Sequence, residues 1–286
     1  MQLTHLALVV ETERVQRGEI KEVAAAIQRQ ITRDFAPIWG QDATIDAFIA
    51  LEDVPPGYWP ILVADGFGTG IIGVHLDDRR QPYALVQLNP TWSLTVSHEA
   101  LEMIADPHCN RLVPGGSPLP GQGLVEFLVE VCDPCSGVQN TYTINGLIVS
   151  DFATPRYFDP IVLPDGRCSF TGALQRPREI LKDGSLAWRE PESGVWWQWE
   201  WIRASQPRFV SLGRLGPNSF ALREAIDSQL LMPWLYEGAP AAHREVVKAQ
   251  TRRDSTRAAS RARAAELRLR ISALADEPSP WTGPSG

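Results

Sequence analysis

The chain has 286 residues, of which 44% are hydrophobic and 8% aromatic, and this composition is typical of a folded globular protein. No run approaches the roughly 18 apolar residues of a membrane helix, and the N-terminal stretch MQLTHLALVV lacks the basic flank and cleavage site of a signal peptide. The 4 cysteines are too few and too unevenly spaced for a secreted disulfide scaffold. We therefore expect a cytoplasmic protein with no membrane partner.

Charge is divided unevenly along the chain. Residues 239–286 hold 9 basic and 5 acidic residues, a net charge of +4, whereas residues 1–238 hold 18 basic and 29 acidic residues, a net charge of −11. An acidic body argues against nucleic acid as a partner and is compatible with a cation site, although solubility alone also accounts for it.

Strand and helix patterns alternate through the first third of the chain. A strand-like run at 3–10 precedes a segment at 17–39 whose apolar residues recur at helical spacing. Further strand-like runs lie at 43–51, 58–65, 71–76 and 83–88. This order predicts a mixed sheet that leads into the next helix.

The stretch LTVSHEALEMIADPHCNRLV, residues 94–113, reads as that helix. An apolar stripe marks its buried face, and Pro107 ends it. His98, Glu99 and Glu102 spell H-E-x-x-E, which differs at one position from the H-E-x-x-H on which zinc proteases hold their metal.

The spacing of this motif suits a metal site. Residues four apart share a helix face, so His98 and Glu102 can bind one ion, and Asp106 lies along the same stripe. Glu99 points about 100° away, an offset that in H-E-x-x-H enzymes keeps the glutamate beside the water that it deprotonates. Zinc accepts a carboxylate as the second ligand, and the added negative charge makes manganese or calcium an alternative.

A zinc site needs a further protein ligand, and the segment EFLVEVCDPC at 126–135 offers the best donors. Glu130 and Asp133 lie there in a short apolar run that an acidic residue has little reason to enter without a partner. His108 has the spacing of the third metzincin histidine, but the glycine of that pattern is absent and a proline intervenes. We rank Glu130 first, Asp133 or Asp106 second, and His108 third.

The run from SHEALEMIADP through EVCDP to VSDFATPRYFDP resembles a group of zincin-like bacterial and phage proteins that carry H-E-x-x-E-x-x-x-D-P followed by E-[IV]-x-D. The resemblance covers roughly residues 1–160 and implies a zincin-type metallopeptidase fold. The roles that it implies are His98 and Glu102 as metal ligands, Glu99 as general base, and Glu130 or Asp133 as the completing ligand.

Several of these features also have a purely structural interpretation. H-E-x-x-E alone is a weak pattern, since glutamate is common on solvated helix faces. Cys132 and Cys135 could be half of a zinc ribbon, a redox pair or two buried residues beside a turn, and a four-cysteine site would need Cys109 and Cys168 to converge with them. Residues 83–86 have the character of the edge strand along which zincins lay a peptide, but any amphipathic strand has the same pattern.

Beyond residue 160 the sequence changes character. FTGALQRPREI, SLAWRE, VWWQWEWI and RFVSLGRLG read as short strands, so we expect a β-rich extension at 161–238, with its alternating tryptophans in the core or on a recognition surface. The Ala/Arg/Leu/Glu-rich stretch at 239–275 predicts a long basic helix. The Pro/Gly/Ser-rich end, 276–286, predicts a disordered tail.

These observations predict an α+β protein whose zincin-like domain at 1–160 carries one zinc site. The expected function is metal-dependent hydrolysis of a peptide or protein substrate. The alternative is a non-catalytic zincin-like module, a phage-related structural or interaction protein in which the same residues hold a structural ion or none. A protein partner could bind the basic C-terminal helix.

Overall fold

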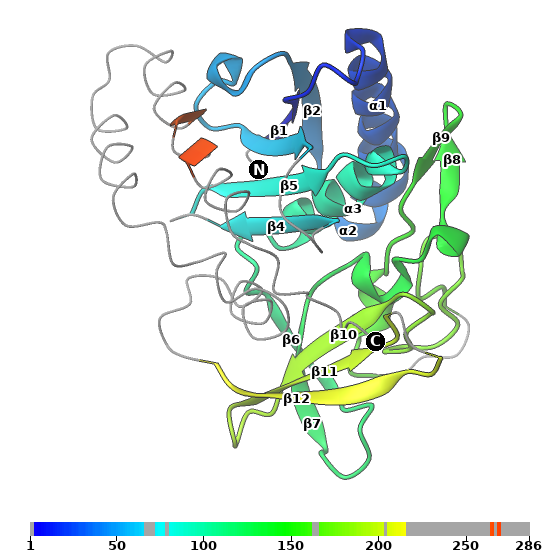
Figure 1. Cartoon of the computed structure of the whole chain (residues 1–286). Coiled ribbons are helices and arrows are strands. Elements are labelled where there is room, and N and C mark those ends of the chain that lie inside the picture. The colour runs from blue at the N-terminus through cyan, green and yellow to red at the C-terminus, as the bar shows by residue number, and fades with distance from the viewer. Residues whose placement is uncertain are drawn as a thin grey trace, which may run out of the picture.

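The protein is an α+β structure built on two five-stranded sheets, which lie one above the other in Figure 1. The computed structural model describes residues 3–65, 72–77, 80–161, 166–202 and 205–215, together with Ala264, Ala265, Arg268 and Leu269. The helix predicted at 239–275 lies outside the described residues apart from these last four, which are helical. The tail predicted at 276–286 lies wholly outside them.

The first sheet has the strand order β2-β1-β3-β5-β4. Its strands are β1 (Thr4–Val10), β2 (Ala43–Phe48), β3 (Trp59–Ala64), β4 (Gly73–Asp77) and β5 (Pro82–Gln87). All are parallel to their neighbours except β4, which runs antiparallel to β5. The interpretation of residues 83–86 as an edge strand is wrong, because they lie in β5 between β3 and β4; in the part of the chain that the structure describes, β4 forms the edge.

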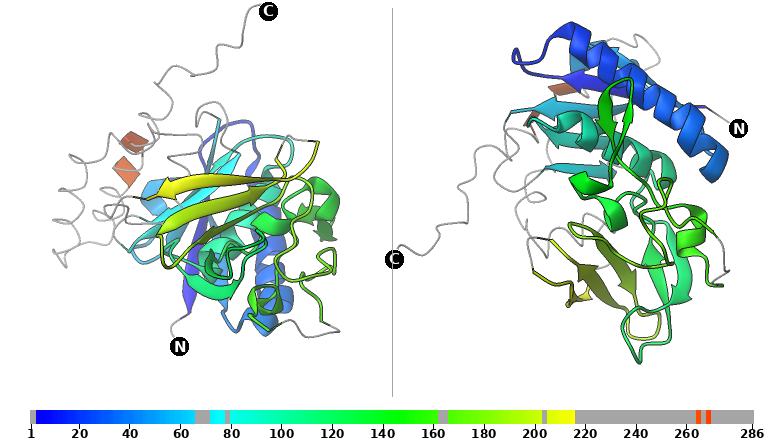
Figure 2. Two further views of the ribbon diagram at one scale, coloured as in Figure 1. Left: turned by 90° about the horizontal axis from the view of Figure 1, so that it is seen from below. Right: turned by 90° about the vertical axis from the view of Figure 1, so that its right-hand side faces the viewer.

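Two helices pack on one face of this sheet, as the side view in Figure 2 shows. Helix α1 (Arg17–Gln30) continues through a π-helical turn, η1 (Ile31–Phe35), into α2 (Ala36–Trp39). Helix α3 (Trp92–Ala105) carries the H-E-x-x-E motif. Alternate residues of β1 bury their side chains against these helices. Among the described residues, no helix is both long and apolar enough to cross a membrane.

The opposite face of the first sheet is covered by a smaller apolar cluster. The other alternate residues of β1 pack there against Leu51 of the 3-10 turn η2 (Leu51–Asp53) and against Ala264. Arg268 forms ion pairs with Glu52 and with Glu11, the latter at 2.7 Å between Nη2 and Oε1. A cation of the basic tail thus contacts carboxylates of the acidic body.

The second sheet is antiparallel throughout and has the order β12-β11-β10-β7-β6. Its strands are β6 (Leu112–Gly116), β7 (Leu124–Leu128), β10 (Ser185–Arg189), β11 (Val195–Glu200) and β12 (Arg208–Arg214). Trp188 and Trp196 are buried, and the other tryptophans of β11 pack against the main core. The strand expected at 170–180 is absent, and the sheet joins strands from both sides of residue 160.

A short hairpin ties the two helices to the rest of the chain. Strands β8 (Tyr142–Ile144) and β9 (Leu147–Val149) stand beside α1, and the single turns η4 (Val138–Asn140) and α4 (Pro155–Phe158) flank them. Fully buried Gln30 of α1 accepts a hydrogen bond from Ser97 Oγ of α3 at 2.7 Å and donates one to Ser150 O at 2.8 Å. This network fixes α3 against α1, and so fixes the direction in which the motif points.

Candidate metal centre

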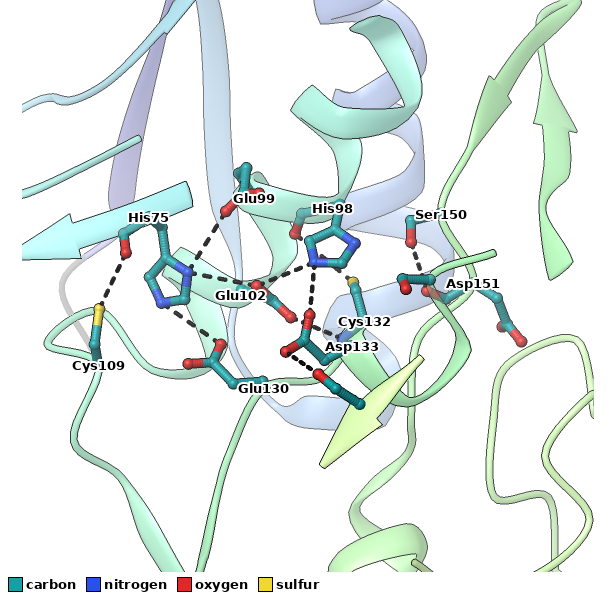
Figure 3. Close-up of polar contacts among 12 residues, drawn as sticks. His75, His98, Glu99, Glu102, Cys109, Glu130, Cys132, Asp133, Ser150 and Asp151 are labelled. Atoms are coloured by element: carbon teal, nitrogen blue, oxygen red, sulfur yellow. Dashed lines mark hydrogen bonds and ion pairs between the residues drawn. The ribbon is translucent and has the colours of Figure 1, made fainter. Parts of the chain in front are cut away.

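The site forms where α3 faces strand β4 and the segment that follows β7 (Figure 3). Residues of β4 alternate between its faces, so Val74 and Leu76 join the small apolar cluster on the far side. His75 points the other way, towards the carboxylates of α3, and only 2% of it is exposed. The edge strand therefore supplies a buried imidazole.

Helix α3 brings its motif side chains to the same place. His98 and Glu102 lie one turn apart, with 3.3 Å between His98 Nε2 and Glu102 Oε2. Glu99 points towards β4, where its Oε2 lies 3.6 Å from His75 Nδ1. Glu99 and Glu102 are 4% and 3% exposed, so both carboxylates depend on partners inside the protein.

The segment after β7 supplies the remaining carboxylates. Glu130 is 4% exposed, and Asp133 begins the 3-10 turn η3 (Asp133–Cys135). The intervening Cys132 N–H donates to Glu102 Oε1 at 3.1 Å, which ties this segment to α3. Ser185 of β10 donates to Asp133 Oδ2 at 3.1 Å and so leaves Oδ1 towards α3.

Three of the residues expected from the sequence converge as one group. His98, Glu102 and Asp133 each place one donor atom within 4.8 Å of the other two. His98 Nε2 lies 3.3 Å from Glu102 Oε2 and 3.4 Å from Asp133 Oδ1. These separations exceed a usual hydrogen bond of about 2.7–3.2 Å. They match the roughly 3.4 Å between two atoms that each lie about 2.1 Å from one tetrahedral ion, so the group fits a divalent cation.

A second group shares Glu102 with the first. His75, Glu102 and Glu130 likewise place donor atoms within 4.8 Å of one another. His75 Nδ1 lies 3.4 Å from Glu102 Oε2, and His75 Nε2 lies 3.8 Å from Glu130 Oε2. We ranked Glu130 first as the further ligand beside His98 and Glu102, but in the structure Asp133 lies there.

The charges of these groups shift one another's pKa values. Burial lowers the pKa of His98, but Glu102 and Asp133 outweigh it and hold that pKa well above its usual value. The pKa of His75 is raised too, against the effect of burial, by Cys109 and the surrounding carboxylates. Burial favours the neutral form of Glu102, yet the two imidazoles hold its pKa well below the usual value. The carboxylates of the centre therefore stabilise a positive charge placed between them.

Asp106 and His108 lie outside both groups. Helix α3 ends at Ala105, so Asp106 leaves the helical stripe, and its Oδ2 accepts a hydrogen bond from the Arg111 backbone N–H at 2.7 Å. Burial raises the pKa of Asp106. His108 is partly exposed and pairs with Asp77, at 3.3 Å between Nδ1 and Oδ1. Asp106 does not continue the helical stripe of His98 and Glu102, because Pro107 stops the helix before Asp106.

The position of Glu99 depends on a glycine of the edge strand. A Cβ at Gly73 would overlap Thr95 Cγ2 and lie 2.5 Å from Glu99 Oε1. We expect Gly73→Ala to lower the free energy of unfolding by about 1–3 kcal/mol, because the buried side chain of Thr95 must shift to make room for the added methyl group. Urea denaturation measures the effect.

The matched control is another strand glycine, Gly116 in β6, where an added Cβ would meet no atom within 4 Å. Gly116→Ala should be neutral or stabilising by up to about 1 kcal/mol. Equal losses in the two variants would show that the contact between β4 and α3 is not close.

Cys109, Cys132 and Cys135 lie near the centre without joining either group. All four cysteines of the chain are free and buried, and burial raises the pKa of Cys109 to about 12. Cys132 donates to the His98 backbone oxygen, at 3.7 Å from Sγ. We expect the double variant Cys132→Ser, Cys135→Ser to keep the metal content of the wild type, because serine retains the donor and neither thiol belongs to a ligand group. Elemental analysis tests this, and a loss of one equivalent would instead reveal a thiolate site.

His75 is the member of the centre that sequence reasoning missed. It lies in the strand-like run IIGVHL, 23 positions before His98, where no motif spacing connects them. The sequence shows only a single histidine among the apolar residues of a strand. A histidine that is buried and hydrogen-bonded in the core gives the same pattern. No family model, curated protein or solved structure matches the chain.

Proposed function

We propose that this protein is a metal-dependent peptide hydrolase whose ion is held by His98, Glu102 and Asp133. The observation that carries the proposal is their convergence at ligand-to-ligand distances, with the separate carboxylate of Glu99 beside them. One imidazole and two carboxylates suit zinc, with manganese as the alternative.

The residues of the centre would have different roles in hydrolysis. When bound, the divalent ion would supply Lewis acidity that polarises a water molecule and the scissile carbonyl. Glu99 belongs to neither ligand group and would take the proton of that water and pass it to the leaving amine. Burial raises the pKa of Glu99, which makes it a stronger base than a solvated glutamate.

A substrate would reach the centre from its more accessible side. Strand β4 does not offer an open edge, because four of its five residues are buried and Cys109 donates to the His75 backbone oxygen, at 3.5 Å from Sγ. His98 and Asp133 have side chains 16% and 13% exposed and form the more accessible side of the centre.

The proposal is tested by cleavage of a peptide library. The protein, purified without a metal-chelating tag, is stripped with a chelator and then supplied with zinc or manganese alone. We expect cleavage with the ion and none after stripping. Absence of cleavage with either ion, together with full metal content, would favour the alternative of a non-catalytic module that holds a structural ion.

A further inference from the structure

Asp133 lies in a short turn and needs support from elsewhere in the chain to act as a ligand. His98 and Glu102 project from α3, a helix of 14 residues, whereas η3 is a single 3-10 turn of 3 residues. A ligand on a regular element has a fixed direction, but a ligand on a short turn is placed precisely only where neighbouring groups hold it. The contacts made by η3 therefore decide whether Asp133 faces the ion.

The segment 181–185 makes these contacts. It leads into β10, the central strand of the second sheet, and includes the first residue of that strand. The Leu181 backbone N–H donates to Pro134 O of η3 at 2.9 Å. In the other direction, Ser136 Oγ donates to the backbone oxygen of Asp183. The turn is thus hydrogen-bonded to the segment at Pro134 and again at the residue after η3.

The second sheet holds this segment in place. The Asp183 N–H donates to Trp201 O at 3.0 Å, and the Trp201 N–H, directly after β11, donates to Gly184 O at 2.9 Å. Gly184 allows a close approach, because an added Cβ would lie 2.5 Å from Pro134 O and 2.9 Å from Asp133 O. The backbone of η3 therefore packs directly against the backbone at Gly184.

Ser185 extends this support to the carboxylate of Asp133. Its Oγ donates to Asp133 Oδ2 at 3.1 Å, and the other oxygen, Oδ1, lies 3.4 Å from His98 Nε2. Ser185 is only 6% exposed, so water competes little for this hydrogen bond. Glu102 is held in the same way, with Oε1 accepting the Cys132 N–H and Oε2 facing His98. Each carboxylate of this ligand group thus has one oxygen bonded to the chain and one oxygen facing the imidazole (Figure 3).

We propose that Ser185 is a positioning residue of the metal centre, which directs Asp133 towards the ion through its hydroxyl group. This inference rests on the proposed function, because it takes His98, Glu102 and Asp133 as the ligands. It goes further by giving the second sheet a part in metal binding. Groups that orient ligands in this way typically contribute about 10–100-fold to metal affinity.

The zinc affinity of the full chain tests the proposal. The protein, purified without a metal-chelating tag and stripped of metal, is titrated with Zn²⁺ in competition with a chelating dye. Ser185→Ala should bind Zn²⁺ about 10–100-fold more weakly than the wild type, with circular dichroism as the check of the fold. The control is Ser193→Ala, beyond the opposite end of β10, where Ser193 Oγ donates to Glu190 Oε2 at 2.6 Å. The control should bind Zn²⁺ as tightly as the wild type.

A double-variant cycle separates positioning from a general structural role. If Ser185 acts through Asp133, Ser185→Ala should cause no further loss of affinity in an Asp133→Asn background. Additive losses would overturn the proposal, as would a Ser185→Ala variant with wild-type affinity, and both results would leave the ligands themselves standing. A wild type that binds no Zn²⁺ would overturn the ligands and the role of Ser185 together. The expected losses of affinity, without peptide cleavage by the wild type, would support the role of Ser185 and reject the hydrolase.

Hydrogen exchange in the wild type gives a measurement that needs no variant. Because coupling is reciprocal, bound Zn²⁺ should strengthen the contact between Ser185 and Asp133 by the same factor by which that contact strengthens Zn²⁺ binding. The amide of Leu181, bonded to Pro134 O, and the amide of Gly184, bonded to Leu181 O, should therefore exchange up to about 10–100-fold more slowly with Zn²⁺ bound. Slower exchange in α3 alone, with no change at these two amides, would overturn the role of Ser185.

Discussion

Glu102→Gln is expected to abolish metal binding at the whole centre, because its carboxylate belongs to both ligand groups. The glutamine keeps the size of the side chain and an oxygen that can accept the Cys132 N–H, so the contact between α3 and the segment after β7 survives. It removes the negative charge that Glu102 contributes to each of the two ligand groups. Changes in groups that merely orient ligands already weaken metal binding by about 10–100-fold, so loss of a shared ligand should cost more than about 100-fold.

Calorimetric titration with Zn²⁺ or Mn²⁺ measures this loss, and circular dichroism checks the fold. A surface variant, Glu22→Gln on the exposed side of α1, controls for the change of net charge. Asp133→Asn should also weaken metal binding, because Asp133 belongs to the ligand group of His98. Metal content in Glu102→Gln equal to that of the wild type would mean that the ligands of α3 have been wrongly assigned.

The part of the centre that sequence could predict is the part encoded by local geometry. His98 and Glu102 share a face because helical spacing puts residues four apart together, and the structure places them so. The approximate position of the further ligand was also accessible, since acidic residues in an apolar run need partners. The choice between Glu130 and Asp133 was not, because it depends on the 3-10 turn that directs Asp133 towards His98.

Non-local contacts explain what sequence could not predict. His75 enters the centre only because β4 runs antiparallel at the edge of the sheet and lies beside α3. A short apolar run does not reveal whether its strand is internal or at an edge, so the pattern at 83–86 alone cannot identify the edge of the sheet. In the same way, nothing local in β6 and β7 indicates that they pair with each other and with β10 across residue 160.

The most informative variant for catalysis is Glu99→Gln. Glu99 follows a ligand by one position, so its carboxylate leaves α3 in another direction and joins neither ligand group. Glutamine preserves the volume of the side chain in the tight space beside Gly73 and removes the base. Loss of a general base lowers the rate by about 10²–10⁴-fold. We therefore expect Glu99→Gln to bind the wild-type amount of metal, to unfold at the same urea concentration, and to cleave the best library peptide at least about 100-fold more slowly.

Comparison with Gly73→Ala separates proton transfer from mere packing. If Glu99 acts as the base, Glu99→Gln loses activity at unchanged stability, whereas Gly73→Ala lowers stability and activity together because it displaces the same carboxylate. If Glu99 only fills space against β4, glutamine should be as active as glutamate, and Gly73→Ala should be the more damaging change. Retention of activity in Glu99→Gln would therefore remove the general base from the mechanism, even with the metal centre intact.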